Sequence, residues 1–159
     1  MKLDRIDLKI LDLLQRDATQ PVARIADQVG LSQTPCWKRI QKHEEAGVIE
    51  RRVAILGAEH LGLNLTAFVF VEPAETGEEW RAHFLEVAER LGPVCDIYRL
   101  AGSFTWLLRV VVPDMEAFEA FYEALTAEVP LRGATSYFAS ERVKVSSALP
   151  ISGMAPCDA

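Results

Sequence analysis

Residues 30–47 read GLSQTPCWKRIQKHEEAG, a stretch that carries the start and stop signals of a helix. Ser32 is a good N-cap, because its hydroxyl can accept a hydrogen bond from a free amide of the first turn. Pro35 falls inside that turn, where amides lack an intrahelical partner anyway. Gly47 supplies a left-handed stop. The stretch therefore predicts a helix that begins after Ser32 and ends before Gly47.

The two sides of this helix differ in chemistry. At about 100° per residue, Cys36, Ile40 and His43 share one side, with Trp37 beside them. The opposite side carries polar and charged side chains, with Arg39 on its flank: Thr34, Lys38, Gln41, Lys42 and Glu45. Phosphates bind cations, and base edges bind amides, hydroxyls and guanidinium groups. The pattern fits a helix that lies in a DNA groove, but an ordinary amphipathic helix with a solvated face would share it.

The preceding segment favours DNA. Residues 21–29 predict a short helix with Ile25 and Val29 on one side; Gly30 ends it and Ser32 opens the next, a tight helix–turn–helix connection. Recognition helices present their N-terminal residues to base edges, so we expect Gln33, Thr34, Lys38 and Arg39 there. Lys42, Arg51 and Arg52 are expected at phosphates. The full set of candidate DNA-binding residues is Ser32, Gln33, Thr34, Pro35, Lys38, Arg39, Gln41, Lys42, Arg51 and Arg52.

Two further elements complete a first domain over residues 1–56. A helix is expected from Asp4 to Arg16, where Asp4 and Asp7 resemble a capping box. Residues 48–56 predict extended structure that would carry Arg51 and Arg52 to a phosphate backbone. Three helices and a strand make a winged helix-turn-helix domain, and residues 57–62 a hinge.

The second half of the chain has a different rhythm. We expect strands over 63–71, 94–100, 104–112 and 135–145, with helices over 78–91 and from 115 onward. The order βαββαβ is the ferredoxin-like split arrangement, so the whole chain is α+β. This domain would span 63–151, and 152–159 would be a flexible tail. Helices on one face leave the other sheet face to pair with a second copy, through apolar strand residues such as Leu65, Ala67, Val69, Val110 and Val112.

Composition agrees with these expectations. The net charge of −6 is uneven: residues 1–60 carry ten basic and nine acidic side chains, whereas residues 61–159 carry seven and fourteen. Only the local field at the contact surface matters for phosphates. Three cysteines without CxxC spacing favour neither a disulfide framework nor a zinc site, and Cys157 is expected to be a free thiol. No signal peptide, cofactor motif or membrane-length segment is apparent, which predicts a cytoplasmic protein.

The chain resembles the leucine-responsive/asparagine-regulator (Lrp/AsnC) family of bacterial and archaeal transcription regulators. The matching residues are 3–11, the run from 29 to 49, residues 102–114 and residues 148–151, so the resemblance covers about residues 2–151. The run from Thr34 to Arg39 looks most like the branch that controls cysteine breakdown genes.

The resemblance implies a double-stranded DNA operator, homodimers that often build octamers, and a small amino acid bound between subunits. Carried over, the effector site would use Ala101, Gly102, Ser103, Phe104, Thr105 and Trp106, with Thr135 and Ser136 from another chain. The family hairpin usually reads Gly, acidic, aromatic, Asp, and both carboxylates are missing here. Phe104 and Trp106 would instead enclose an apolar or sulfur-containing side chain, with cysteine as first candidate. A plain hairpin whose aromatics lie in a subunit contact is the competing interpretation.

Three other features of the sequence allow different interpretations. His43 stands where the family usually has an apolar residue; we expect a neutral core histidine, with pH sensing as the alternative. A DNA-coating architectural protein would have the same fold without an effector. An enzyme is disfavoured, because His43, His60 and His83 lie in separate elements with no nucleophile or carboxylate at a motif spacing.

Overall fold

The computed structural model describes residues 2–154, and Cys157 with most of the expected tail lies outside that range. The described chain forms two compact units: one contains residues 2–55 and 144–154, the other residues 56–143. Each unit has its own hydrophobic core. The chain returns from the second unit to the first between residues 143 and 144. This return was not expected, because residues 144–151 were predicted to belong to the second domain.

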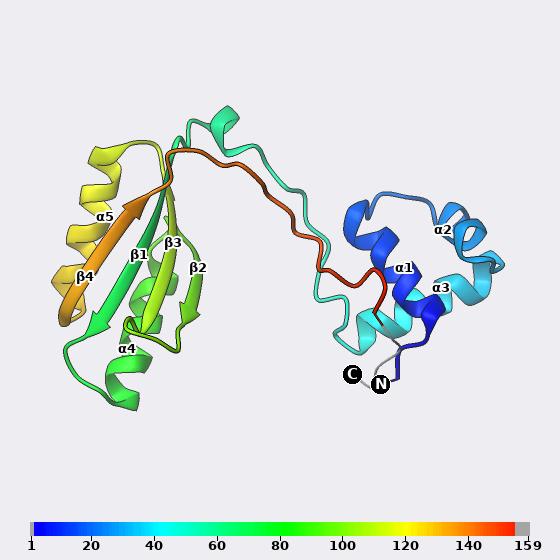
Figure 1. Ribbon diagram of the computed structural model, residues 1–159, viewed down its shortest axis with the longest axis horizontal. Coiled ribbons are helices and arrows are strands. Elements are labelled where there is room, and N and C mark those ends of the chain that lie inside the picture. Colours follow the sequence, from blue (N-terminus) through cyan, green and yellow to red (C-terminus); the bar gives the residue numbers. More distant parts are fainter. Residues whose placement is uncertain (1, 155–159) are drawn as a thin grey trace. The chain divides into compact units, whose positions relative to one another are not determined.

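The first unit is built from three helices: α1 (Arg5–Arg16), α2 (Val22–Val29) and α3 (Gln33–Glu45). Figure 1 shows them at the blue and cyan end of the chain. They enclose a small core of Ile10, Leu14, Ile25, Ala26, Cys36 and Ile40. A core of this size stabilises its three helices only marginally.

Local capping signals explain where these helices begin and end. The capping box of α1 is confirmed: the Asp4 carboxylate accepts from the amides of Ile6 and Asp7, and the Asp7 carboxylate accepts from the Asp4 amide. Gly30 and Gly47 both adopt positive φ, as expected for left-handed stops. Ser32 is the N-cap residue of α3, but its hydroxyl makes no capping hydrogen bond, so that part of the prediction is wrong.

The strand predicted over 48–56 does not form. Residues 50–57 have no regular structure, and Val53, Ile55 and Leu56 are exposed. A strand needs a neighbour to accept and donate its backbone hydrogen bonds, and no described segment of the chain pairs with this one. The expected hinge contains a short 3₁₀ helix, η1 (Ala58–Leu61), ended by Gly62 in the left-handed region.

The second unit has the expected βαββαβ order. Its elements are β1 (Leu65–Pro73), α4 (Glu78–Arg90), β2 (Val94–Arg99), β3 (Trp106–Val112), α5 (Met115–Glu128) and β4 (Leu131–Phe138). The strands form one antiparallel sheet in the order β2-β3-β1-β4, visible in Figure 1. The last strand was predicted over 135–145; it begins four residues earlier and ends at Phe138, where its pairing with β1 ends.

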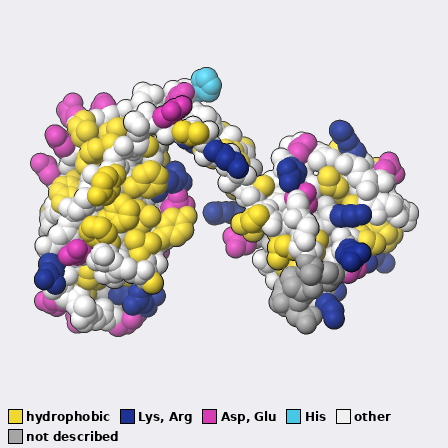
Figure 2. Space-filling view, in the orientation of Figure 1, with side chains coloured by type: hydrophobic (Ala, Val, Ile, Leu, Met, Phe, Trp, Pro, Cys, Tyr) yellow, Lys and Arg dark blue, Asp and Glu magenta, His cyan; other side chains and the backbone are white. Residues whose placement is uncertain are grey.

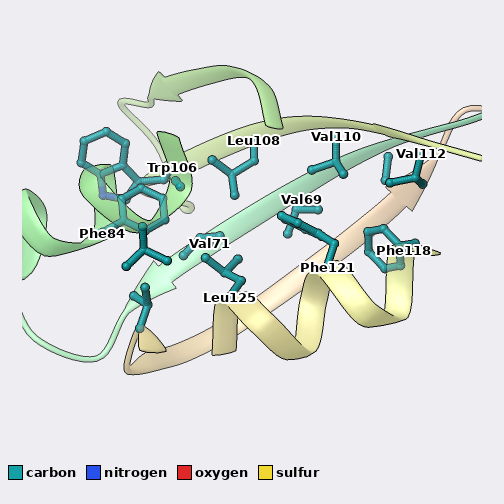
Figure 3. Close-up of a cluster of buried hydrophobic side chains, with 14 of the residues drawn as sticks. Val69, Val71, Phe84, Trp106, Leu108, Val110, Val112, Phe118, Phe121 and Leu125 are labelled. Carbon is teal, nitrogen blue, oxygen red and sulfur yellow. The ribbon is translucent and has the colours of Figure 1, made fainter. Parts of the chain in front are cut away.

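Both helices cover the same face of this sheet. Alternate residues of β1 and β3 are buried against them, including Val69, Val71, Leu108 and Val110, which meet Phe121 and Leu125 of α5 in Figure 3. Residues that alternate along a strand point to opposite faces. All five residues named above for the uncovered face therefore belong to the covered one: Ala67, Val69, Val110 and Val112 are buried there, and Leu65 is partly buried against the same core. The uncovered face carries Thr66, Phe68, Phe70, Glu72, Leu107, Arg109 and Val111 instead.

Candidate nucleic-acid interface and effector surface

The outer face of α3 is polar, as predicted. Cys36, Ile40 and His43 are buried, which anchors the opposite side of the helix on the first unit. Most of the predicted DNA-binding residues of the turn and helix are exposed: Ser32, Gln33, Thr34, Pro35, Lys38 and Lys42. Gln41 is half-buried. Figure 2 shows Lys and Arg side chains spread over the unit that contains α3. The helix thus offers cations and hydrogen-bonding groups to a partner while its other side is held.

Arg39 is engaged within the protein. Its Nη1 atom lies 2.7 Å from Asp4 Oδ2 and 2.6 Å from Asp7 Oδ1, and its side chain is 32 % exposed. The hydrogen bonds that Arg39 donates to Asp4 and Asp7 raise its pKa further above the ordinary value. The pKa of Asp4 is lowered, first by the hydrogen bond from the Asp7 amide and then by Arg39. The sequence analysis expected this guanidinium at a base edge and could not foresee two partners more than thirty residues away.

Trp37 and the basic pair after α3 complete this surface. Trp37, expected beside the core, is 47 % exposed. Arg51 and Arg52 are both exposed, and Arg52 forms a 2.7 Å ion pair with Glu44. An exposed pair of this kind contributes at most about 1 kcal/mol, so Arg52 can exchange Glu44 for a phosphate at small cost.

The Gly102 turn lies between β2 and β3. Ala101, Gly102 and Ser103 are exposed, and Phe104 and Thr105 are half-buried. Gly102 does not adopt positive φ, and a Cβ placed on it would meet nothing within 4 Å. The turn therefore does not require glycine for its own conformation. What glycine provides here is open access to the backbone amides.

The remaining effector residues divide between the two faces of the sheet. Phe104 packs on Phe70 of the uncovered face, with ring centroids 5.1 Å apart, and Tyr137 meets Phe70 at 5.7 Å. Trp106 is 5 % exposed and packs against Phe84 in the covered core, so it cannot line the same surface as Phe104.

The register of β1 with β4 places the last two candidates. Thr135 pairs with Phe70 on the uncovered face, whereas Ser136 pairs with Val69 and points toward the helices. Thr135 can therefore share a surface with Phe104, and Ser136 of the same chain cannot.

A carboxylate that the sequence analysis missed lies on the uncovered face. Glu72 pairs with Gly133 in register, and its Oε2 is 4.0 Å from the place where a Cβ on Gly133 would stand. It follows Phe70 by two residues, so both side chains leave β1 on the same side. Figure 2 shows hydrophobic side chains gathered over the strands of this unit. Only the strand register, which the sequence does not state, could have revealed this acidic group beside an aromatic cluster.

Other chemistries find little support in the described part of the chain. Among residues 2–154, no three His, Cys, Asp or Glu side chains gather in a way that could hold a metal ion. None of the described helices combines the length and the hydropathy needed to cross a membrane.

Comparison with known proteins agrees over nearly the whole chain. Residues 3–42 match the AsnC-type helix-turn-helix domain, and residues 66–149 match the Lrp/AsnC ligand binding domain. The DNA-binding transcriptional activator DecR of Escherichia coli is 41 % identical over 150 residues, which cover 94 % of this chain and 99 % of DecR.

Solved structures give the same answer. An AsnC family transcriptional regulator from Agrobacterium tumefaciens has a TM-score of 0.91 at 46 % identity, over 96 % of this chain and 99 % of that one. A transcriptional regulator from Neisseria meningitidis, solved as a complex with L-Met, has a TM-score of 0.89 at 29 % identity, over 94 % and 97 %. The relatives named above are transcription regulators. The chain belongs to the Lrp/AsnC family of DNA-binding transcription regulators.

Proposed function

We propose that this regulator reads a specific operator with the outer face of α3 and responds to a small amino acid bound at the Gly102 turn. The observation that carries the first part is the division of α3 into a buried side and an exposed polar side. Gln33, Thr34 and Lys38 occupy its N-terminal half and would meet base edges. Lys42, Arg51 and Arg52 would meet phosphates.

Two variants and one control test this assignment. Lys42→Ala removes one phosphate contact, so affinity should fall on every duplex and the slope of log affinity against log salt should shrink by about one unit. Thr34→Ala should weaken the preferred site more than a scrambled duplex. Lys9→Ala removes an exposed lysine from α1 and is the matched control. Equal affinities for Lys42→Ala and Lys9→Ala would refute the assignment.

The effector surface is proposed from three groups on one face of the sheet. The exposed amides of Gly102 and Ser103 offer a site for a ligand carboxylate, and Phe70 with Phe104 offers an apolar wall. The Glu72 carboxylate supplies the negative charge that the turn itself lacks, and it would accept a charge-assisted hydrogen bond from the α-ammonium group of the ligand. A second copy would contribute Thr135. The class of ligand is an amino acid with a small apolar or sulfur-containing side chain, cysteine first, with methionine, bound by the Neisseria relative, next.

Calorimetric titration with cysteine, methionine, leucine, asparagine and tryptophan tests this surface. Gly102→Glu should fold normally, because open space surrounds Gly102, yet it should lose binding since its carboxylate repels that of the ligand. Glu72→Gln should weaken binding about tenfold or more, as expected for loss of one charge-assisted hydrogen bond. Glu89→Gln changes an exposed carboxylate on α4 and is the control. Full binding by Gly102→Glu would show that the site lies elsewhere.

The uncovered sheet face supports a dimer as the smallest working unit. Phe68, Phe70, Leu107 and Val111 give it an apolar centre, and an ion pair between Asp96 and Arg109 lies at its side. A pair of copies related by a two-fold axis presents two α3 helices to a pseudo-palindromic operator. Octamers of such dimers belong to the same proposal.

A further inference from the structure

Four side chains join the start of α1 to the middle of α3. Arg39 contacts Asp4 and Asp7 at 2.7 and 2.6 Å, and His43 Nε2 lies 3.1 Å from Asp7 Oδ1. We name Asp4, Asp7, Arg39 and His43 the α1–α3 cluster. The sequence separation of 32 to 36 residues makes each contact a tertiary one.

The two carboxylates serve two purposes at once. Asp4 Oδ1 accepts from the amides of Ile6 and Asp7, both at 2.8 Å, which leaves Oδ2 for Arg39. Asp7 Oδ2 accepts from the Asp4 amide at 2.9 Å, which leaves Oδ1 for Arg39 and His43. The groups that cap α1 therefore also hold α3.

His43 completes the cluster one helical turn after Arg39. Its ring is 1 % exposed, and its Nδ1 has no hydrogen-bond partner among the described residues. Because a carboxylate oxygen accepts, the contact with Oδ1 calls for a hydrogen on Nε2. The histidine supports Asp7 from the buried side while Arg39 does so from the half-exposed side.

We propose that Arg39 is a positioning residue: with Asp4 and Asp7, it sets the rotation of α3 about its own axis and thereby the aim of the DNA-reading face. Side chains reach about 5–6 Å from a helix axis, so a 20° rotation moves their ends by about 2 Å. That displacement exceeds the tolerance of a hydrogen bond to a base. Both carboxylate contacts are made by Nη1, so turning this nitrogen toward guanine would break the link between α1 and α3.

The inference rests on the proposed role of α3, and one variant separates it from simple electrostatics. Asp4→Asn keeps a good N-cap but removes the charge that holds Arg39. Loss of a negative charge near DNA should by itself leave affinity unchanged or raise it. Positioning predicts the opposite: operator affinity falls about three- to tenfold, and the salt slope stays at its wild-type value. Asp27→Asn removes an exposed negative charge from α2 and is the control.

A double-mutant cycle completes the test. Arg39→Gln should weaken operator binding at least as much as Asp4→Asn, and the double variant should be little weaker than Arg39→Gln, since both break one link. Circular dichroism before each titration checks folding, and Arg39→Met, which keeps an unbranched side chain but offers no donor to either carboxylate, serves if Arg39→Gln is unfolded. If Lys42→Ala weakens binding but Asp4→Asn binds as well as Asp27→Asn, the inference is wrong while the proposed function stands. If Lys42→Ala has no effect, the proposed function itself fails. A salt slope one unit smaller in Arg39→Gln would make Arg39 a phosphate contact and overturn the proposal.

Discussion

The C-terminal segment should be held on the first unit mainly by Gln15. The Leu149 amide donates to Gln15 Oε1 at 2.8 Å, and Gln15 Nε2 donates to the Leu149 carbonyl at 3.0 Å. The side-chain amide of Gln15 thus pairs with both backbone polar groups of Leu149, as a neighbouring strand would. Arg16 adds a 3.4 Å contact to Ser152. Leu149 is 68 % exposed, so its side chain adds little apolar packing to these contacts.

Gln15→Ala removes both hydrogen bonds to Leu149. Each contributes a net of about 0.5–1.5 kcal/mol, and the exposed setting favours the lower end, so the segment should lose about 1–1.5 kcal/mol. That free energy corresponds to an opening equilibrium about five- to twelvefold larger. Amide hydrogen exchange read by mass spectrometry on peptides covering 144–154 should accelerate by the same factor.

Two further variants sharpen this measurement. Gln15→Glu keeps an acceptor for the Leu149 amide but loses the donor, so its exchange should be intermediate. Gln28→Ala removes hydrogen bonds made within the α2 region and should leave the segment unchanged. If Gln15→Ala exchanges at the wild-type rate over 144–154, the segment is held by something other than this pair and the reasoning is refuted.

Three other predictions follow from capping, titration and the open face. Ser32→Ala should change the unfolding free energy by less than about 0.5 kcal/mol in urea denaturation, because the Ser32 hydroxyl makes no capping hydrogen bond. Asp4→Ala should lower it by about 1 kcal/mol or more, because the Asp4 carboxylate caps α1. Equal losses in the two variants would contradict the observed caps. The pKa of Asp4 is lowered in the folded protein, so its stabilisation is complete above the ordinary value of 3.8 and is lost as pH falls through the lowered pKa. Stability measured from pH 6 to pH 2 should fall less steeply in Asp4→Asn, and an identical slope would contradict a lowered pKa of Asp4 in the folded protein. Phe70→Lys should give folded monomers in analytical ultracentrifugation, because it places a charge in the centre of the uncovered face, and an unchanged dimer would rule out that face as the interface.

The sequence predicted best what depends on near neighbours. The capping box at Asp4 and the stops at Gly30 and Gly47 follow from residues within one helical turn. The βαββαβ order was confirmed because each element has a clear hydrophobic period. The family resemblance was confirmed by comparison over both units.

What depends on a distant partner was not predictable. Arg39 has the residue type and helix position of a base reader, and only the folded structure brings Asp4 and Asp7 to it. The strand residues predicted for the uncovered face were the wrong set. Alternation along a strand gives two sets of residues, and only the position of the helices decides which set is covered. Trp106 belongs to the covered set for this reason. Residues 50–57 have the composition of a strand, but nothing in the described chain pairs with them.

The most direct test of sequence-specific reading by α3 is the affinity ratio between a selected operator and a scrambled duplex of equal length. The operator would come from repeated selection of bound DNA from a random pool, and affinities would be measured at several salt concentrations. We predict a pseudo-palindromic site bound about 10³-fold or more tightly than the scrambled duplex at physiological salt. The ratio should fall when Thr34 is replaced by alanine. Equal affinity for both duplexes at every salt concentration would contradict the account and would favour a DNA-coating protein.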